Sequence, residues 1–213
     1  MTGKLGQKIL PGRIVIVSSP SGGGKTSICR RILTMARRRQ GWVFSVSYTT
    51  RHRRPREKDG REYRFVSEAV FQRRQQQRFF AESFKVHRYF YGTPRRPLED
   101  IIRGGGVMLL DVDVRGALAL KRTYREAITI FILPPSITAL KRRLKRRGTE
   151  TTEMRQVRFD NARREEMPKY ERFEYTVVNR QLSTAVQQVL AIIAADLSRT
   201  KFMSKEQIKQ LLG

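Results

Sequence analysis

The stretch of residues 13–38 constrains the fold more than any other part of the chain, because it combines an apolar strand, a glycine-rich loop and a helix. Residues 13–18 form a short, largely β-branched run, which is typical of a strand buried in a parallel sheet. A helical pattern follows at about residues 25–38. The loop between them reads Ser19-Pro20-Ser21-Gly22-Gly23-Gly24-Lys25-Thr26. This order predicts an α/β fold that begins with a phosphate-binding loop.

The loop fits the phosphate-binding pattern G-x-x-x-x-G-K-[S/T], except that Ser19 replaces the first glycine. Consecutive glycines let backbone N–H groups point inward around phosphate oxygens, and the helix N-terminus adds partial positive charge. Lys25 is placed to reach the β- and γ-phosphates of a nucleotide, and the Thr26 hydroxyl to bind Mg²⁺. An ordinary glycine-rich turn is the alternative, but the Lys-Thr pair and the apolar strand favour the phosphate loop.

Strands and helices alternate along most of the remaining chain, which predicts a parallel α/β sheet flanked by helices. Further buried strands are expected at residues 107–110, 128–133 and 175–178, and helices at about residues 114–122, 136–147, 151–169, 182–199 and 204–212. Asp111 follows the strand 107–110, at the sheet edge where ligands bind in open α/β folds. Such an aspartate is commonly a turn residue or helix cap, but the phosphate loop favours a role with the metal, directly or through water.

Two segments depart from this alternation within what we interpret as a single domain of residues 1–213. Residues 45–105 are more polar, with short strands expected at 62–66 and 89–91, and are interpreted as a small lobe inserted into the core. Residues 143–158 are very basic and are interpreted as a lid between two core elements. The core then comprises residues 1–44, 106–142 and 159–213.

The chain carries 45 Lys+Arg residues against 19 Asp+Glu, a formal net charge of +26. Such a charge attracts polyanions, so a nucleic-acid-binding protein and a nucleotide enzyme with a cationic surface are both compatible with it. The apolar runs are far shorter than the roughly 20 residues of a membrane span, and residues 1–8 hold no signal-peptide stretch. We therefore expect a cytoplasmic protein with no membrane partner. One cysteine excludes an internal disulfide, and with only His52 and His87 it argues against a Cys/His zinc site.

Motifs beyond the loop resemble, in order, those of the guanylate kinase family. Residues 45–55 read SVSYTTRHRRP and resemble the family signature S-x-T-T-R-x-x-R-P. The segments that follow in the family order are residues 60–66 (GREYRFV), 80–82 (FAE), 91–93 (YGT), 111–116 (DVDVRG, resembling D-x-D-x-x-G), 130–136 (IFILPPS) and 143–148 (RLKRRG). The resemblance runs from about Gly12 to Asn179. It implies a P-loop NTPase-like core with an inserted GMP-binding lobe and a small basic lid.

The resemblance also implies the GMP-binding residues, which fall into two groups. Those expected to hold the GMP phosphate are Arg51, Arg54, Tyr63 and Tyr91. A guanidinium suits this role because its planar fork pairs with two phosphate oxygens. Those expected around the guanine are Ser47, Glu82, Thr93 and Asp113. A carboxylate there can accept the guanine N1–H and N2–H₂ together, a pair that adenine does not offer.

On the ATP side, the resemblance assigns Asn179 to the adenine and the whole loop from Ser19 to Thr26 to the phosphates. The residues expected to act on the transferring phosphoryl group are Lys25, Arg143, Arg147 and Arg158. The implied cofactor is Mg²⁺, which binds together with ATP and would be held by Thr26 and Asp111. The implied substrates are ATP and GMP, and the oligomeric state is left open by the sequence.

The implied activity is transfer of the γ-phosphoryl of ATP to GMP, and to dGMP, which belongs to purine nucleotide metabolism. The acceptor is an already ionised phosphate oxygen, so no general base is needed and catalysis is positioning plus charge neutralisation. The alternatives are a scaffold domain that holds a phosphopeptide, an ATP-driven nucleic-acid protein, and a kinase of the same fold for another small phosphate ester. Retention of Lys25 and the lid arginines argues against the scaffold domain. The guanine-binding set argues against the nucleic-acid protein, so at most weak, non-specific nucleic-acid binding is expected.

Four residues depart from the family pattern without removing a group that the mechanism requires. They are Arg56, Ser83, Pro94 and Arg180. Arg56 stands where the family usually has glycine, and Pro94 restricts Thr93 toward extended backbone. Arg180 follows Asn179 where an acidic or amide residue is common, which affects the expected detail of adenine binding.

Overall fold

The core of the protein is a parallel sheet, seen in a computed structural model that describes residues 12–36, 41–55, 57–86, 88–145, 152–202 and 209. Within these residues the sheet has five strands in the order β2 (Trp42–Phe44), β7 (Val107–Asp111), β1 (Arg13–Ser18), β8 (Ile128–Leu133) and β9 (Tyr175–Val178). Every pairing between neighbours is parallel. This confirms the predicted parallel α/β core, with the strand of the phosphate loop at its centre.

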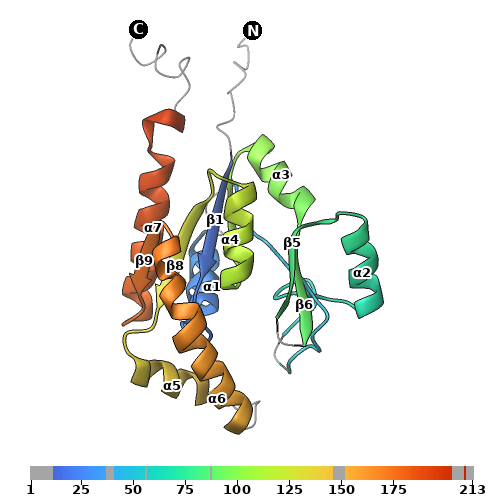
Figure 1. Cartoon of the computed structure of the whole chain (residues 1–213). Helices are drawn as coiled ribbons and strands as arrows, with labels where there is room; N and C mark the ends of the chain where they lie inside the picture. The colour runs from blue at the N-terminus through green and yellow to red at the C-terminus, as the bar shows by residue number, and fades with distance from the viewer. Residues whose placement is uncertain are drawn as a thin grey trace.

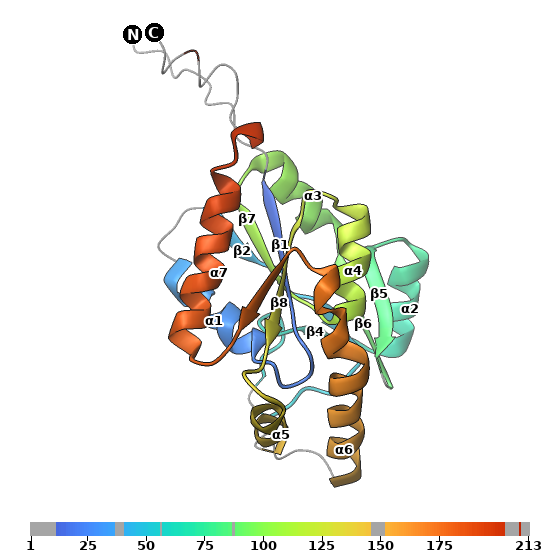
Figure 2. The same cartoon turned by 60° about the vertical axis from the view of Figure 1, so that its left-hand side comes forward.

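Helices cover both faces of the sheet because alternate side chains of β1 point to opposite sides. Val15 and Val17 pack with α1 (Lys25–Ala36) and α7 (Leu182–Leu197). Ile14 and Ile16 pack on the other face, where α3 (Arg95–Gly104) and α4 (Val114–Thr123) lie. Figures 1 and 2 show these two layers from two directions. No helix in the described part of the chain is both long and apolar enough to cross a membrane.

A second sheet forms a lobe beside the core, with the strand order β4-β3-β6-β5. Its elements are β3 (Tyr48–Thr49), β4 (Arg64–Phe65), α2 (Glu68–Gln76), β5 (Phe80–Val86) and β6 (Tyr89–Pro94). Phe71 stacks on Phe80 with ring centroids 4.5 Å apart and on Phe90 at 5.4 Å. This small aromatic core holds α2 against the strands on the side away from the main sheet (Figure 1).

Two helices extend beyond the carboxyl end of the core sheet. They are α5 (Ile137–Lys145) and α6 (Thr152–Asn161). The sequence predicted one helix over residues 151–169, but α6 passes into a π-helix (Ala162–Glu166) and then a 3₁₀-helix (Met167–Arg172). A π-helical turn widens the helix locally, and such turns are frequent at functional sites. The predicted helix at residues 204–212 lies outside the described residues except for Lys209.

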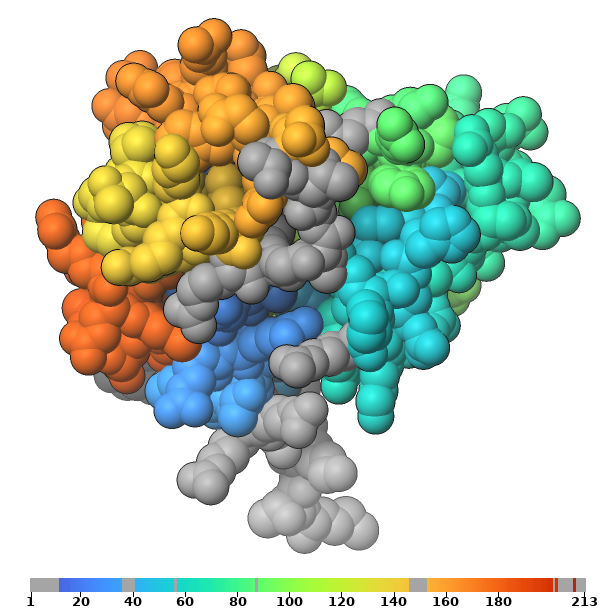
Figure 3. Space-filling model, turned by 90° about the horizontal axis from the view of Figure 1, so that it is seen from below, coloured from blue at the N-terminus to red at the C-terminus, as the bar shows by residue number. Residues whose placement is uncertain are grey.

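The arrangement leaves the phosphate loop between the lobe and the two extending helices. Seen from below, α5 and α6 (yellow and orange) lie on one side and the lobe (cyan and green) on the other (Figure 3). Because the core strands are parallel, the carboxyl ends of β1, β7, β8 and β9 all meet at this place. Residues that follow these strands are therefore brought together although they are far apart in sequence.

Candidate active site

The phosphate loop connects β1 to α1, and three contacts from distant parts of the chain hold it. Gly24 has a φ of +101°, and a Cβ there would lie 2.4 Å from Asn179 Nδ2. That amide donates to the Gly23 carbonyl at 3.1 Å, and Arg143 Nη1 donates to the same oxygen at 3.0 Å. Arg143 Nη2 also donates to the Asn179 carbonyl at 2.8 Å. The loop is therefore held in one conformation from its outer, carbonyl side.

The third contact comes from Glu166, which the sequence did not identify. The Ser21 backbone N–H donates to Glu166 Oε2 at 2.6 Å. Glu166 is the last residue of the π-helix, so the widened turn is what places its carboxylate against the loop. Burial, reinforced by the negative charge of Asp113, raises its pKa above the usual glutamate value. Arg158 of α6 and Lys25 both lie within electrostatic range of this carboxylate.

Lys25 forms an ion pair with Asp111, the last residue of β7. The pairing of β1 with β7 sets Val17 beside Asp111, which brings that carboxylate to the end of the phosphate loop. Burial disfavours the charged ammonium, but the nearby Asp111 carboxylate outweighs it and raises the pKa of Lys25. Lys25 is therefore a fully charged cation at neutral pH. Its ion pair with Asp111 was not predicted from the sequence, and the predicted role of Asp111 with a metal stays a prediction.

Three of the residues expected around the guanine, Ser47, Thr93 and Glu82, form a hydrogen-bonded chain in the lobe. The hydroxyl of Thr93 donates to Glu82 Oε1 at 2.5 Å, and Ser47 Oγ lies 3.4 Å from the same hydroxyl. The register of β5 and β6 sets Glu82 opposite Thr93. Asp113 caps α4 by accepting from the Gly116 N–H at 2.8 Å. A Cβ at Gly116 would lie 3.3 Å from Glu82 Oε2, so this glycine leaves room for the glutamate.

The carboxyl group of Glu82 is strongly perturbed. Burial, reinforced by the charge of Asp113, raises its pKa to about 7, although the bond from Thr93 favours the ionised form. An ionised carboxylate has about four acceptor positions, so the bonds from Thr93 leave Glu82 able to accept further donors. The site can therefore satisfy Glu82 fully when a ligand supplies N–H groups.

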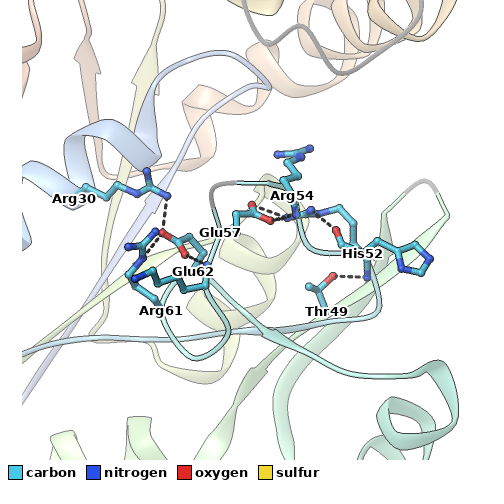
Figure 4. A network of polar contacts seen from close by, with 9 residues as sticks. Arg30, Thr49, His52, Arg54, Glu57, Arg61 and Glu62 are labelled. Carbon is cyan, nitrogen blue, oxygen red and sulfur yellow. Dashed lines mark hydrogen bonds and ion pairs between the residues drawn. The ribbon is translucent and has the colours of Figure 1, made fainter.

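Three of the residues expected at the GMP phosphate, Arg51, Tyr63 and Tyr91, lie together, and Arg54 is joined to them through its backbone. Its guanidinium carbon lies 5.7 Å from the centroid of the Tyr63 ring, and Tyr63 packs edge-on against Tyr91 at 5.8 Å. Arg51 donates to the Glu57 carboxylate, which also accepts from the backbone N–H of Arg54 (Figure 4). Burial raises the pKa of Tyr63 to about 12, so its hydroxyl stays protonated and can donate to an anion.

Tyr63 is also the residue that joins the two halves of the site. Its hydroxyl interacts electrostatically with Lys25 and Asp111 of the core, and with Arg51 and Tyr91 of the lobe. The expected phosphate-binding groups of the lobe therefore lie close to the phosphate loop. A donor phosphate on the loop and an acceptor phosphate on Arg51 would be neighbours.

A pocket of about 300 Å³ opens on the other side of the loop. Its lining includes Gly24, Ser27, Arg143, Asn179 and Leu182. This position, next to the first turn of α1 and away from the lobe, suits a nucleobase attached to phosphates on the loop.

The geometry agrees with comparisons against known proteins. A family model described as "Guanylate kinase" matches residues 11–196. This chain belongs to the guanylate kinase family. It is 40% identical over 190 residues to a guanylate kinase of Thermotoga maritima, covering 89% of this chain and 90% of that one. It is 38% identical over 188 residues to a guanylate kinase of Clostridium tetani, covering 88% of each chain.

Solved structures give the same result. A crystal structure of guanylate kinase from Anaplasma phagocytophilum superposes with a TM-score of 0.75 and 29% sequence identity, covering 92% of each chain. Membership of this family makes the chain a nucleoside monophosphate kinase, which is a phosphotransferase. The resemblance read from the motifs is thereby confirmed.

Most residues that the guanylate kinase motifs singled out are brought to one place, but their roles stay predictions. Arg143 and Asn179 contact the loop carbonyl of Gly23 rather than standing free. Arg147 and Arg56 lie outside the described residues. Glu57 and Glu166 are the site carboxylates that sequence reasoning missed. Cys29 of α1 is fully buried beneath the loop, and burial raises the pKa of its thiol well above the usual value.

Proposed function

We propose that the phosphorylation of GMP by ATP, which follows from membership of the family, extends to dGMP and takes place in the cytoplasm. ATP would bind on the loop from Ser19 to Thr26, with its base in the pocket beside Asn179. GMP would bind in the lobe. The observation that carries this proposal is the position of Tyr63, which packs beside Arg51 and Tyr91 in the lobe and lies within electrostatic range of Lys25 at the loop.

The lobe would recognise the guanine base of the acceptor through hydrogen bonds. Glu82 would accept the guanine N1–H and N2–H₂, while Ser47, Thr93 and Asp113 complete the surroundings. The acceptor phosphate would be held by Arg51, Arg54, Tyr63 and Tyr91. Adenine would leave the buried carboxylate of Glu82 unpaired, which costs on the order of 1–3 kcal/mol or more. Sites of this kind can reject an analogue by roughly 10⁴-fold.

The chemistry needs charge neutralisation and alignment, because the attacking phosphate oxygen is already ionised. Lys25 is the charged cation at the loop, and Arg143 is fixed to the Gly23 carbonyl beside it. Arg158 and Arg147 are the further cations that we assign to the transferring group. Lobe and lid would close over both substrates and exclude water from the phosphoryl group.

Thr26 and Asp111 offer the hard oxygen ligands that Mg²⁺ prefers, and Mg²⁺ bound with nucleotides commonly uses only one or two protein oxygens. In the described residues no three His, Cys, Asp or Glu side chains come together as a metal site. Mg²⁺ supplies further neutralisation of the phosphate charge when it is bound with ATP. We therefore assign the two residues to the ATP-bound metal.

The test is a coupled assay of ADP release with GMP, dGMP, AMP, CMP and UMP as acceptors. We expect strong turnover with GMP and dGMP and almost none with AMP. Equal use of AMP and GMP would contradict the role of the lobe. Turnover that is unaffected by removing Mg²⁺ with EDTA would contradict the metal assignment.

A further inference from the structure

The Glu57 carboxylate connects the two arginines that we assign to the acceptor phosphate. Arg51 Nη2 lies 2.8 Å from Glu57 Oε1 and 2.9 Å from Oε2, and the Arg54 backbone N–H donates to Oε2 at 2.9 Å. Figure 4 shows the Glu57 carboxylate beside Arg54, with dashed lines for its hydrogen bonds. The side chains of Arg51 and Glu57 are only 10% and 13% exposed. The contact is therefore largely shielded from water, where a hydrogen-bonded ion pair is strong.

Glu57 is ionised and surrounded by positive charge. Burial alone would raise its pKa, but the hydrogen bond from Arg51 and the Arg54 N–H outweigh burial and lower it. The same segment carries several further cations, namely Arg53, Lys58, Arg61 and Arg64. Like charges at this spacing repel one another, so a carboxylate is needed to keep the Arg51 guanidinium at one position beside Tyr63.

We propose that Glu57 is a positioning residue for the acceptor phosphate, acting by fixing the Arg51 guanidinium against the backbone of Arg54. This inference rests on the proposed function, in which Arg51 binds that phosphate. An arginine has five N–H groups. The bonds to Glu57, to the His52 carbonyl at 2.7 Å and to Tyr91 do not occupy the whole guanidinium, so it can hold the carboxylate and a phosphate together.

A competing role would be that Glu57 occupies the place of the phosphate and must leave when GMP binds. The contact with Arg54 argues against it, because a departing carboxylate would also abandon that backbone N–H. Glu57 follows Arg51 by six residues in the same short loop, so the two side chains move together with the lobe. The carboxylate is thus part of the pocket wall and stays when the site fills.

The experiment compares Glu57→Gln with the wild-type enzyme. Glutamine keeps the size and one acceptor oxygen but removes the charge that holds Arg51. We expect the KM for GMP to rise about tenfold, because bonds to charged groups are about this strong, while the KM for ATP stays within about twofold. Binding of guanosine, which has no phosphate, should be unchanged in calorimetry. Glu57→Asp should recover part of the loss.

Glu68→Gln is the matched control, because it removes the same charge from the same lobe at an exposed position in the first turn of α2. Its kinetics should equal those of the wild type. Equal loss of guanosine and GMP binding in Glu57→Gln would overturn the proposal, since it would show a general defect of the lobe. An unchanged KM for GMP would overturn the proposal as well. A lower KM would also overturn it, because it would show that Glu57 competes with the GMP phosphate for Arg51.

Arg51→Lys separates this inference from the proposed function on which it rests. If Arg51→Lys leaves the KM for GMP unchanged, the assignment of Arg51 to the phosphate is wrong. If Arg51→Lys raises it but Glu57→Gln does not, only the role of Glu57 is wrong. We expect the double variant to lose much less than the product of the two single losses, because both changes remove the same contact.

Discussion

The two phosphate-binding parts of the site are built in different ways. The phosphate loop offers backbone N–H groups, and it is held by Arg143, Glu166 and Asn179, which lie 120 to 156 residues away in the chain. The lobe offers side chains, and Arg51 is held by Glu57, only six residues away. The proposed donor phosphate site therefore depends on the packing of the whole core, whereas the position of Arg51 in the proposed acceptor site depends on one short loop. Substitutions in the phosphate loop should therefore change the KM for ATP, and substitutions in the lobe should change the KM for GMP.

The largest effect on turnover is expected at Lys25, where the phosphate loop faces the lobe. Lys25→Ala should lower kcat by roughly 10³-fold or more, because we assign to Lys25 the neutralisation of charge that moves during transfer. The measurement is steady-state turnover with both nucleotides saturating, together with thermal unfolding. Because the change leaves Asp111 without its cation, Lys25→Ala/Asp111→Asn is the control for folding. Turnover close to wild type would remove Lys25 from the mechanism.

Glu82→Gln tests whether the lobe reads the base independently of the loop. The amide keeps the size but presents an NH₂ group toward a guanine donor, so the KM for GMP should rise by about 10²-fold. The KM for ATP should change by less than about twofold, because we assign ATP to the phosphate loop at Lys25. Each nucleotide is varied separately at saturating concentrations of the other. Equal damage to both constants would show that the two parts are not separable.

The pH dependence of the lobe follows from the Glu82 carboxyl group, whose pKa is raised to about 7. Guanine needs the ionised form, so affinity should increase as the pH rises from about 6 to 8. Guanosine is the ligand to titrate, because a phosphate has its own ionisation near pH 6. The Glu82→Gln variant should show no such change.

The same shift affects stability with the opposite sign. The folded protein holds the Glu82 proton more tightly than the unfolded chain does. The free energy of unfolding, relative to Glu82→Gln, should therefore be greatest below about pH 4.5 and decline up to about pH 7. Denaturant unfolding at several pH values measures this difference, and a rise over that interval would contradict the buried, protonated state.

The smallest effect is expected at Glu166, on the loop side. Glu166→Gln weakens a charge-assisted bond to the Ser21 N–H. The KM for ATP should rise by about three- to tenfold while that for GMP stays constant. Glu165→Gln is the matched control, because Glu165 is the residue before Glu166 on the same helical turn and its side chain is exposed. A lower KM for ATP would instead show that Glu166 occupies the place of a phosphate oxygen.

The sequence predicted the core far better than the lobe, for a physical reason. Four core strands, at residues 13–18, 107–111, 128–133 and 175–178, coincide closely with the expected apolar runs. Three of them, β1, β7 and β8, are buried along almost their whole length, whereas β9 at the sheet edge buries only Val177. β5 has mixed polarity without clean alternation and was not expected as a strand. β2 was missed because it has only three residues at the edge of the sheet.

Site residues could be predicted where they belong to a recognisable sequence motif. They could not be predicted where only the folded structure brings the side chain to the site. Lys25 and Asp111 follow from the loop pattern and from a strand end. Glu166 reaches the loop only because a π-helical turn interrupts the helix that the sequence predicted as continuous. Glu57 could have been suspected, because it is an acidic residue among six basic ones, but its pairing with Arg51 required the fold of the loop.

The buried thiol beneath the phosphate loop gives the protein an internal reporter. Cys29 is the sole cysteine of the chain and lies on the helix that begins with Lys25, with no exposed surface. Because burial also disfavours its thiolate, a thiol-specific reagent can reach a reactive sulfur only when α1 separates from the sheet. The rate at which Cys29 is labelled in the unmodified protein therefore reports how often α1 separates from the sheet. The factor by which ATP slows this labelling would measure how strongly the bound nucleotide stabilises the closed structure.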